Sequence, residues 1–229
     1  MIIDWYLIRH AHFERQLQEK IITGRATTVQ LTADGIEQVQ LLAQRFDRDC
    51  MRFDEFDVSP AIRAWGTGFG VYSYLGLDPD MMNIEEDLQE HNKGDWEGRH
   101  QDEVLTEAIK REINENGWDF RPPNGETFRE LERRALEYFR RKIQLAPRKD
   151  RYVFCAISHT NTIRCGLRGV MNFPPQFALN LEIDNTSITH LQYCTTTDAW
   201  RVVCINDTGH FIGTRFSRSL RYAVQAIWP

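Results

Sequence analysis

Residues 2–12 of this chain read IIDWYLIRHAH. The stretch from Ile3 to Ile8 is apolar and rich in β-favouring residues, which is typical of a strand buried inside a sheet. It ends abruptly at Arg9 and His10, so two ionisable side chains directly follow the strand. The pattern predicts a buried strand that carries chemistry at its carboxyl end.

A second stretch repeats this arrangement. Residues 151–161 read RYVFCAISHTN, which predicts a strand from Arg151 to Ile157, then a polar cluster around His159 and a helix through Leu167. In open parallel sheets, ligands bind beyond the carboxyl ends of the strands, near helix N-termini that favour anions. The two histidines are therefore expected at such a place.

The rest of the sequence alternates strand-like and helix-like segments. Thr32 is a plausible N-cap, and Thr127 and Glu130 have the spacing of a capping box. The predicted elements are helices from Ala33 to Phe46 and from Thr127 to about Leu145, a strand from Phe56 to Val58, a helix opened by Ser59-Pro60, and a hairpin of strands from Ile188 to Tyr193 and from Trp200 to Ile205. The glycines at 66, 68 and 70 lie in a helical stretch, so they predict close helix packing rather than a nucleotide loop.

Strands that alternate with helices predict an α/β fold, here a three-layer α/β/α sandwich whose mostly parallel sheet has helices on both faces. No repeat or flexible linker interrupts the chain, so one domain over residues 1–229 is expected. Residues 99–127 are predicted to form a cover-like insertion over the site, and residues 211–229 a C-terminal tail.

Composition limits the classes of function. The formal net charge of the 229 residues is -5 and the pI is about 5.8, so no overall basic field indicates a nucleic-acid partner. We also expect no membrane partner and a cytoplasmic location, because neither a signal peptide nor a bilayer-spanning apolar run is evident. The five cysteines never form C-x-x-C, so no disulfide framework, zinc site or other cofactor is predicted. Whether the chain forms a homo-oligomer is left open by the sequence.

Arginines accompany the histidines. Arg9 precedes His10, and Arg63 follows the predicted strand that ends at Val58. Guanidinium groups bind phosphate oxygens through two parallel hydrogen bonds, which neither lysine nor a neutral donor reproduces. The shared ligand is therefore predicted to be a phosphate.

At this point the sequence resembles the histidine phosphatase superfamily, of the phosphoglycerate-mutase-like kind, over nearly its whole length. The resemblance is carried by the number, order and spacing of several short motifs. These are Arg9-His10-Ala11 (RHG), Thr23-Gly24-Arg25 (substrate loop), Leu31 to Gly35 (LTxxG), Ser59 to Thr67 (SPxxRAxxT), Leu88 to Glu90 with Gly94 to Gly98 (LxE and GxWEG), Pro123 to Thr127 (PxGES/T) and Ser158-His159-Thr160 (SHG).

The resemblance implies a mechanism and a set of site residues. His10 would be the nucleophile that becomes phosphorylated, and Glu90 would protonate the leaving oxygen and then activate water. Arg9, Arg63, His159 and Thr160 would bind the phosphoryl group, and Gln16, Thr23 and Gly24 would contact the substrate. The short run after Glu90 favours the phosphatase branch, acting without metal on a small phosphorylated metabolite.

Two features depart from the family pattern. Ala11 and Thr160 stand where glycine is usual, and a threonine resists positive φ and adds a hydroxyl near the phosphate. One extra residue separates Gly24-Arg25 from Leu31-Thr32, so the substrate loop is expected to differ in shape.

Several other functions stay open. Phosphoglycerate mutase activity and a phosphate-binding pseudoenzyme fit the same motifs. His10-Ala11-His12 also suits a metal-dependent hydrolase with an H-x-H pair, although further ligand motifs are missing. The aromatic residues in or near the predicted cover favour either an apolar or sugar-bearing leaving group or a local core; they are Trp96, Trp118, Phe120 and Phe128.

Overall fold

The computed structural model describes residues 1–18 and 20–217 of the chain. Residues 218–229 of the predicted C-terminal tail lie outside this part, whereas Arg215 of the same tail lies within it and pairs with Asp34 and Glu37. No helix of the described residues has both the length and the apolar character needed to cross a membrane.

One six-stranded sheet organises the fold, with the strand order β3-β2-β4-β1-β5-β6. The predicted strands and the hairpin at the sheet edge are confirmed, with ends that differ by one or two residues. The strands are β1 (Ile2–Arg9), β2 (Glu55–Val58), β3 (Asn83–Ile84), β4 (Arg151–Ser158), β5 (Ile188–Cys194) and β6 (Ala199–Asp207).

The sheet is mixed rather than mostly parallel. β1, β2, β3 and β4 pair in parallel, but β5 runs antiparallel to both β1 and β6. The short turn between β5 and β6 accounts for part of this, because a tight hairpin can only join antiparallel strands. The α/β class that the sequence predicts is confirmed.

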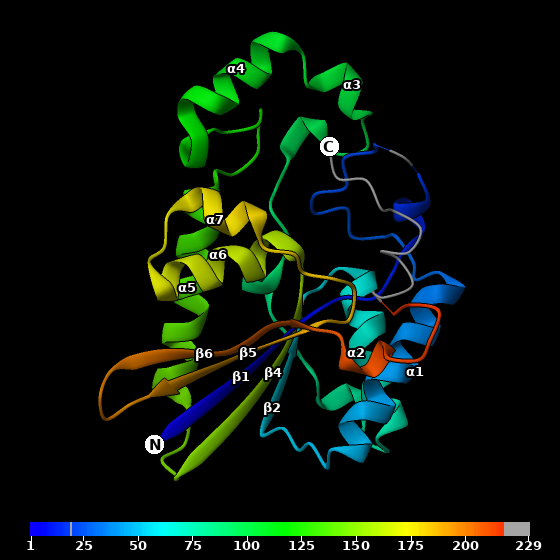
Figure 1. Ribbon diagram of the computed structural model, residues 1–229, viewed down its shortest axis with the longest axis vertical. Coiled ribbons are helices and arrows are strands. Elements are labelled where there is room, and N and C mark those ends of the chain that lie inside the picture. The colour runs from blue at the N-terminus through cyan, green and yellow to red at the C-terminus, as the bar shows by residue number, and fades with distance from the viewer. Residues whose placement is uncertain (19, 218–229) are drawn as a thin grey trace.

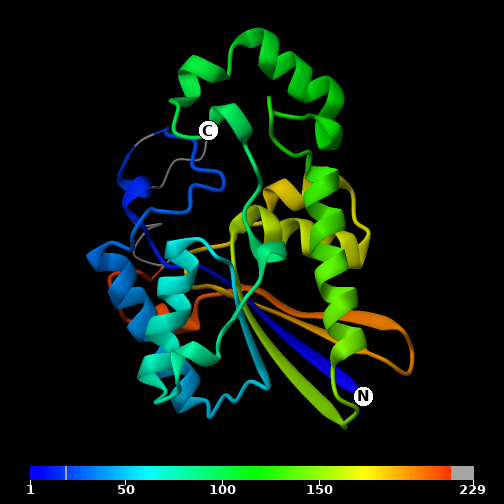
Figure 2. The ribbon, with the colours of Figure 1, turned by 180° about the vertical axis from the view of Figure 1, so that it is seen from behind.

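Helices cover the sheet, as Figures 1 and 2 show from opposite sides. Side chains alternate along β1, so Ile8 packs with one group of helices while Trp5 and Leu7 pack with another. The first group is α1 (Ala33–Arg48) and α2 (Ile62–Tyr74), and the second includes α5 (Phe128–Leu145) and α6 (Thr160–Met171), beside α7 (Pro175–Asn180).

Two predicted helix starts are confirmed. The Thr32 hydroxyl accepts a hydrogen bond from the amide of Gly35, and Thr127 forms a reciprocal capping box with Glu130. The prediction for Ser59-Pro60 is wrong, because α2 begins at Ile62 with Ala61 as its N-cap. Ser59 instead continues β2 through a bond from its amide to the carbonyl of Ile157, and its hydroxyl contacts an imidazole of the site described below.

The glycines of α2 serve close packing, as predicted. A Cβ at Gly70 would lie 2.5 Å from a methyl group of Val39 on α1, and one at Gly68 would lie 2.7 Å from Val58 on β2. Both separations are too short for carbon atoms, so larger residues would push α2 away from its neighbours. Since α2 carries Arg63, these glycines help to set the distance between that arginine and the sheet.

Residues between β3 and α5 form an extension beyond the main body. It contains α3 (Gln101–Val104) and α4 (Glu107–Asn116), which arch over the remainder of the molecule in Figure 1. Its apolar residues, among them Trp96, Val104 and Phe120, form a small core with Ile22 from the loop after β1. Residues 99–127, predicted as an insertion, lie within this segment, and their role as a cover over the site stays a prediction.

Candidate active site

The carboxyl ends of three parallel strands bring the predicted residues together. Arg9 at the end of β1 lies opposite Ser158 at the end of β4, and the amide of His10 donates to the Ser158 carbonyl at 2.9 Å. The rings of His10 and His159, which follow these strands, have centroids 5.0 Å apart. Arg63 reaches them from the first turn of α2.

His10 is buried and held as a neutral imidazole. Its Nδ1 lies 2.8 Å from the carbonyl oxygen of Ala11, and because a carbonyl only accepts, Nδ1 carries the proton. The lone pair is therefore on Nε2, which accepts from Nε of Arg63 at 3.3 Å. Burial, followed by the charges of Arg63 and Arg9, holds the pKa of His10 well below its ordinary value of 6.5. The nitrogen available for attack faces the cation expected to bind phosphate.

Arg63 is a buried cation held by neutral groups. Its Nη atoms donate to the carbonyls of Ala26 and Gly24 and to Nδ1 of His159. Burial lowers its pKa to about 10, so it stays charged at neutral pH. Among the described residues its guanidinium forms no direct ion pair, although the charges of Glu90 and Glu97 act on it from nearby. A buried cation without a direct ion pair is costly, so this position suits an anion.

Arg9 supplies a second cation of the same kind. Its Nη1 donates to the carbonyl of Ile183 at 2.7 Å, whereas its buried Nε has no hydrogen-bond partner. Burial lowers the pKa of Arg9 to about 10. Among the described residues Arg9 forms no ion pair either. The guanidinium groups of Arg9 and Arg63 therefore both line the cavity without a direct anionic partner.

His159 lies behind Arg63. Its Nδ1 accepts from Arg63 at 3.1 Å, so the proton is on Nε2, which donates to the Ser59 hydroxyl at 2.8 Å. Burial, with the charges of Arg63, His10 and Arg9, lowers the pKa of His159 well below 6.5. The ring is fully buried and does not line the cavity, so a direct contact between His159 and phosphate stays a prediction.

Glu90 lines the cavity together with Arg9, His10 and Arg63. One carboxylate oxygen accepts from the amide of His91 at 2.8 Å, and the other accepts from the amide of Asn161 at 3.3 Å. These backbone bonds fix the carboxylate on the cavity wall, close to the amino-terminal end of α6. The side chain lines the same cavity as His10, which the predicted proton-donating role requires.

The two departures from the family pattern cause no backbone conflict. Neither Ala11 nor Thr160 has a positive φ. Thr160 is the first residue of α6 and lines the cavity beside Asn161. Sequence reasoning missed Asn161, although its place one residue after Thr160 at a helix start was a usable signal.

The predicted substrate residues Gln16, Thr23 and Gly24 also line the cavity. Gly24 has a φ of +52°, and a Cβ there would lie 2.6 Å from the carboxyl carbon of Glu97, so the loop requires glycine. Gln16 hydrogen-bonds Asn185, whose amide group donates to the carbonyl of His10 at 2.9 Å. Asn185 was not predicted from the sequence, because nothing local marks a residue 175 positions from His10.

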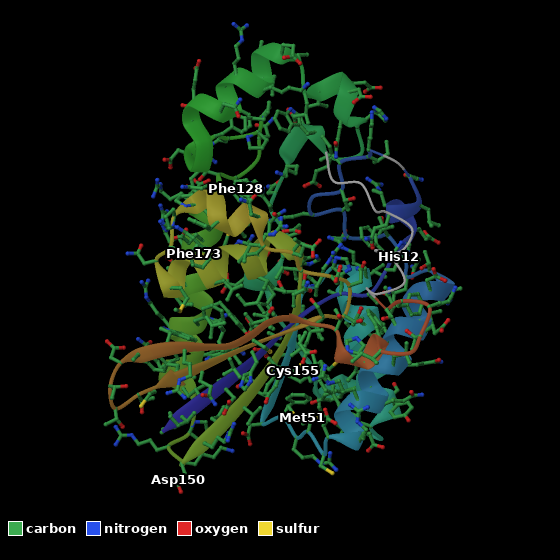
Figure 3. All side chains as sticks on the ribbon, viewed as in Figure 1. His12, Met51, Phe128, Asp150, Cys155 and Phe173 are labelled. Atoms are coloured by element: carbon green, nitrogen blue, oxygen red, sulfur yellow. The ribbon has the colours of Figure 1, made fainter. Side chains whose placement is uncertain are left out.

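The cavity itself has a volume of about 510 Å³ and two chemically different ends. The charged end contains Arg9, His10, Arg63 and Glu90. The other end is walled by apolar side chains of the β3–α5 segment and of the loop after β1, including Ile22, Trp96, Leu105, Ile113, Phe120 and Phe128. Figure 3 shows Phe128 at the end of α5 that faces the extension.

The predicted aromatic residues divide between the cavity and the core. Trp96, Phe120 and Phe128 line the cavity, and Trp96 stacks on Phe120 with centroids 5.6 Å apart. Trp118 packs against Leu131 and Cys165 instead, and its indole N–H donates to Glu132 at 3.0 Å. It also stacks on Phe128, with ring centroids 4.9 Å apart, and so supports one residue of the cavity wall from behind.

Comparison with known proteins agrees with this geometry. The family model of the histidine phosphatase superfamily (branch 1) matches residues 5–208. A 2,3-bisphosphoglycerate-dependent phosphoglycerate mutase of Methylobacterium sp. (strain 4-46) is 29% identical over 161 residues, which are 69% of this chain and 76% of the relative. One from Brucella melitensis biotype 2 is 25% identical over 185 residues, 80% of this chain and 87% of the relative.

Solved structures share the fold. A putative alpha-ribazole-5'-P phosphatase from Escherichia coli aligns with a TM-score of 0.75 and 24% identity, covering 90% of this chain and 96% of that one. A mycobacterial glucosyl-3-phosphoglycerate phosphatase aligns with a TM-score of 0.76 and 18% identity, covering 91% and 100%. The match of the family model over most of the sequence, with the site residues gathered at one sheet edge, shows that this chain belongs to the histidine phosphatase superfamily, branch 1.

Proposed function

We propose that this protein is a phosphomonoesterase that works through a phosphohistidine at His10, without a metal ion, on a small phosphorylated metabolite. The observation that carries the proposal is the contact between His10 Nε2 and Arg63 at 3.3 Å. In this contact a neutral imidazole meets a buried guanidinium that forms no direct ion pair with the described residues. Such a pair suits the attack of nitrogen on an electron-rich phosphoryl group.

The reaction has two steps. His10 Nε2 forms a bond to phosphorus as the bond between phosphorus and the ester oxygen breaks, and Glu90 gives a proton to the departing alcohol. Water then attacks the phosphohistidine, Glu90 takes back a proton, and phosphate is released. Arg9, Arg63 and Thr160 bind the oxygens of the transferring group and stabilise the charge that develops on them. His159 joins them once its ring gives up its contact with Arg63 or Ser59.

The alternative of phosphoglycerate mutase activity is supported by the names of the sequence relatives. The cavity favours hydrolysis of a different ester. Phosphoglycerate is small and polar, whereas most of the wall beyond the charged end is apolar. The structures of similar fold include phosphatases, such as those for alpha-ribazole phosphate and glucosyl-3-phosphoglycerate named above.

The metal-dependent and pseudoenzyme alternatives have less support. Nδ1 of His12 lies 2.8 Å from the Thr32 hydroxyl, whereas His10 faces Arg63. The described residues contain no group of three His, Cys, Asp or Glu side chains that could hold a metal ion. Thr160, which made a pseudoenzyme conceivable, sits in ordinary helical backbone beside the cavity.

Hydrolysis of para-nitrophenyl phosphate in EDTA tests the proposal. We expect turnover that EDTA does not reduce, because His10 and its neighbours need no added ion to attack. Activity that appears only with added divalent metal would favour the H-x-H hydrolase. Conversion of 3-phosphoglycerate in the presence of its bisphosphate, at a rate above any hydrolysis, would favour the mutase, and inactivity on all phosphoesters would favour the pseudoenzyme.

A further inference from the structure

Lys93 is a lysine on the wall of the cavity, three residues after Glu90. Its side chain lies over the ring of Phe128, with Nζ 5.2 Å from the ring centroid. Within the part of the chain that the structure describes, Nζ has neither a hydrogen bond nor an ion pair. Burial lowers the pKa of Lys93. The ammonium is thus partly stripped of water and lacks an anionic partner.

The acids nearest this lysine are already committed to other donors. Glu90 accepts from two backbone amides, as described above. One oxygen of Glu97 accepts from the amides of Arg25 and of Lys93 itself. Glu126 accepts from Arg25, from Arg134 and from the amide of Asn92. Each of these carboxylates already accepts from at least two other donors, and none forms an ion pair with Lys93.

The position of the ammonium within the cavity is also informative. Phe128, which it contacts, lines the cavity with Trp96 and Phe120, and Lys93 also lies close enough to Glu90 for that charge to act on it. A phosphoryl group held beside His10 leaves most of the 510 Å³ for the rest of the substrate. The rest of the substrate would meet mainly apolar side chains. Lys93 is a cation among the polar groups that interrupt this apolar surface.

We propose that the leaving group of the substrate combines an apolar, ring-bearing body with a carboxylate, and that Lys93 binds this carboxylate while Trp96, Phe120 and Phe128 enclose the body. The inference rests on the proposed function, since it concerns the alcohol that His10 chemistry would release. A carboxylate fits better than a second phosphate, because a single ammonium offers one charge and no guanidinium fork. His91 beside it adds no charge, since burial and Lys93 lower its pKa to about 3.

The test compares kcat/KM for phenyl phosphate with that for carboxyphenyl phosphate, in its meta and para isomers. We expect the wild-type protein to favour one carboxylate isomer by about 10- to 100-fold, the range of a partly buried charged hydrogen bond. In Lys93→Met, which keeps the length of the side chain and removes the charge, this ratio should fall to near one. Lys110→Met is the control, because Lys110 is exposed on α4 and pairs with Glu107, so its ratio should match the wild type.

A change of preference separates charge recognition from a packing role. Phenyl phosphate carrying an aminomethyl group should be a poor substrate of the wild type and should improve relative to phenyl phosphate in Lys93→Met. Hydrolysis that depends on His10 but shows no carboxylate preference, or a preference that survives Lys93→Met, would overturn the inference and leave the proposed function standing. A Lys93-dependent preference for a second phosphate over the carboxylate would overturn it as well. Inactivity on every ester would overturn both proposals.

Discussion

Replacing His10 with asparagine should lower kcat/KM for para-nitrophenyl phosphate by about 10⁴-fold or more, which is the scale of losing a nucleophile. Asparagine can keep a polar contact near the Ala11 carbonyl, but it has no lone-pair nitrogen to attack phosphorus. The measurement is initial rate against substrate concentration for both proteins, with thermal unfolding recorded to confirm that the variant is folded.

His12 provides the matched control for this substitution. It lies two residues away, but its ring hydrogen-bonds the Thr32 hydroxyl rather than Arg63. His12→Asn should therefore retain kcat/KM within about tenfold, since asparagine can still bond that hydroxyl. Equal losses in the two variants, or near wild-type activity in His10→Asn, would show that His10 is not the nucleophile.

Replacing Arg63 with methionine should reduce kcat/KM by about 10³-fold and change its pH dependence. The rate falls because the phosphoryl group loses a buried guanidinium. The pH effect follows from the attack by neutral His10, whose pKa is held well below 6.5 by burial and then by Arg63 and Arg9. Without Arg63 this pKa rises, so the loss of activity on acidification should begin at a higher pH than in the wild type.

Arg63→Lys separates the two roles of the arginine. Lysine keeps a positive charge near His10 but cannot make the same set of bonds to Gly24, Ala26 and His159. Its activity should also fall, by about 10²-fold, while its acid limb stays close to that of the wild type. Profiles of kcat/KM between pH 4 and 8 on one substrate test this, and an unchanged acid limb in Arg63→Met would contradict the electrostatic account.

Much of the site followed from sequence because it depends on strand ends. The apolar run before Arg9-His10 and the one before His159 predicted two buried strands, and parallel pairing then required their carboxyl ends to meet. The register of β1 and β4 confirms this, with Arg9 opposite Ser158. The motif around Arg63 placed that residue on a helix after a third strand, which is where it lies.

Other features depend on contacts between distant segments and were not predictable from local pattern. Serine before proline is typical of a helix N-cap, but the hydroxyl of Ser59 contacts His159, 100 residues away in the sequence. The helix begins only at Ile62. The direction of β5 is set by its place beside β1 and by the hairpin to β6, so strand-helix alternation alone overstated the parallel character of the sheet.

Side-chain direction in the extension also had to come from structure. Trp118 precedes α5 and Phe128 is its first residue, and nothing in the sequence distinguishes their roles. Phe128 lines the cavity, whereas Trp118 bonds Glu132 in a small core. The sequence around Lys93 contains several acids, so it does not reveal that the ammonium forms no ion pair. That depends on the hydrogen bonds that Glu97 and Glu126 accept from other donors in the folded chain.

The most direct test of the account is to trap the covalent intermediate. Rapid quenching of the protein with a phosphomonoester at alkaline pH, followed by mass spectrometry of its peptides, should show one phosphate on His10 that is lost on mild acid treatment and absent from His10→Asn. Turnover of the same ester without any phosphate on His10, or with phosphate on another residue, would contradict the phosphohistidine mechanism.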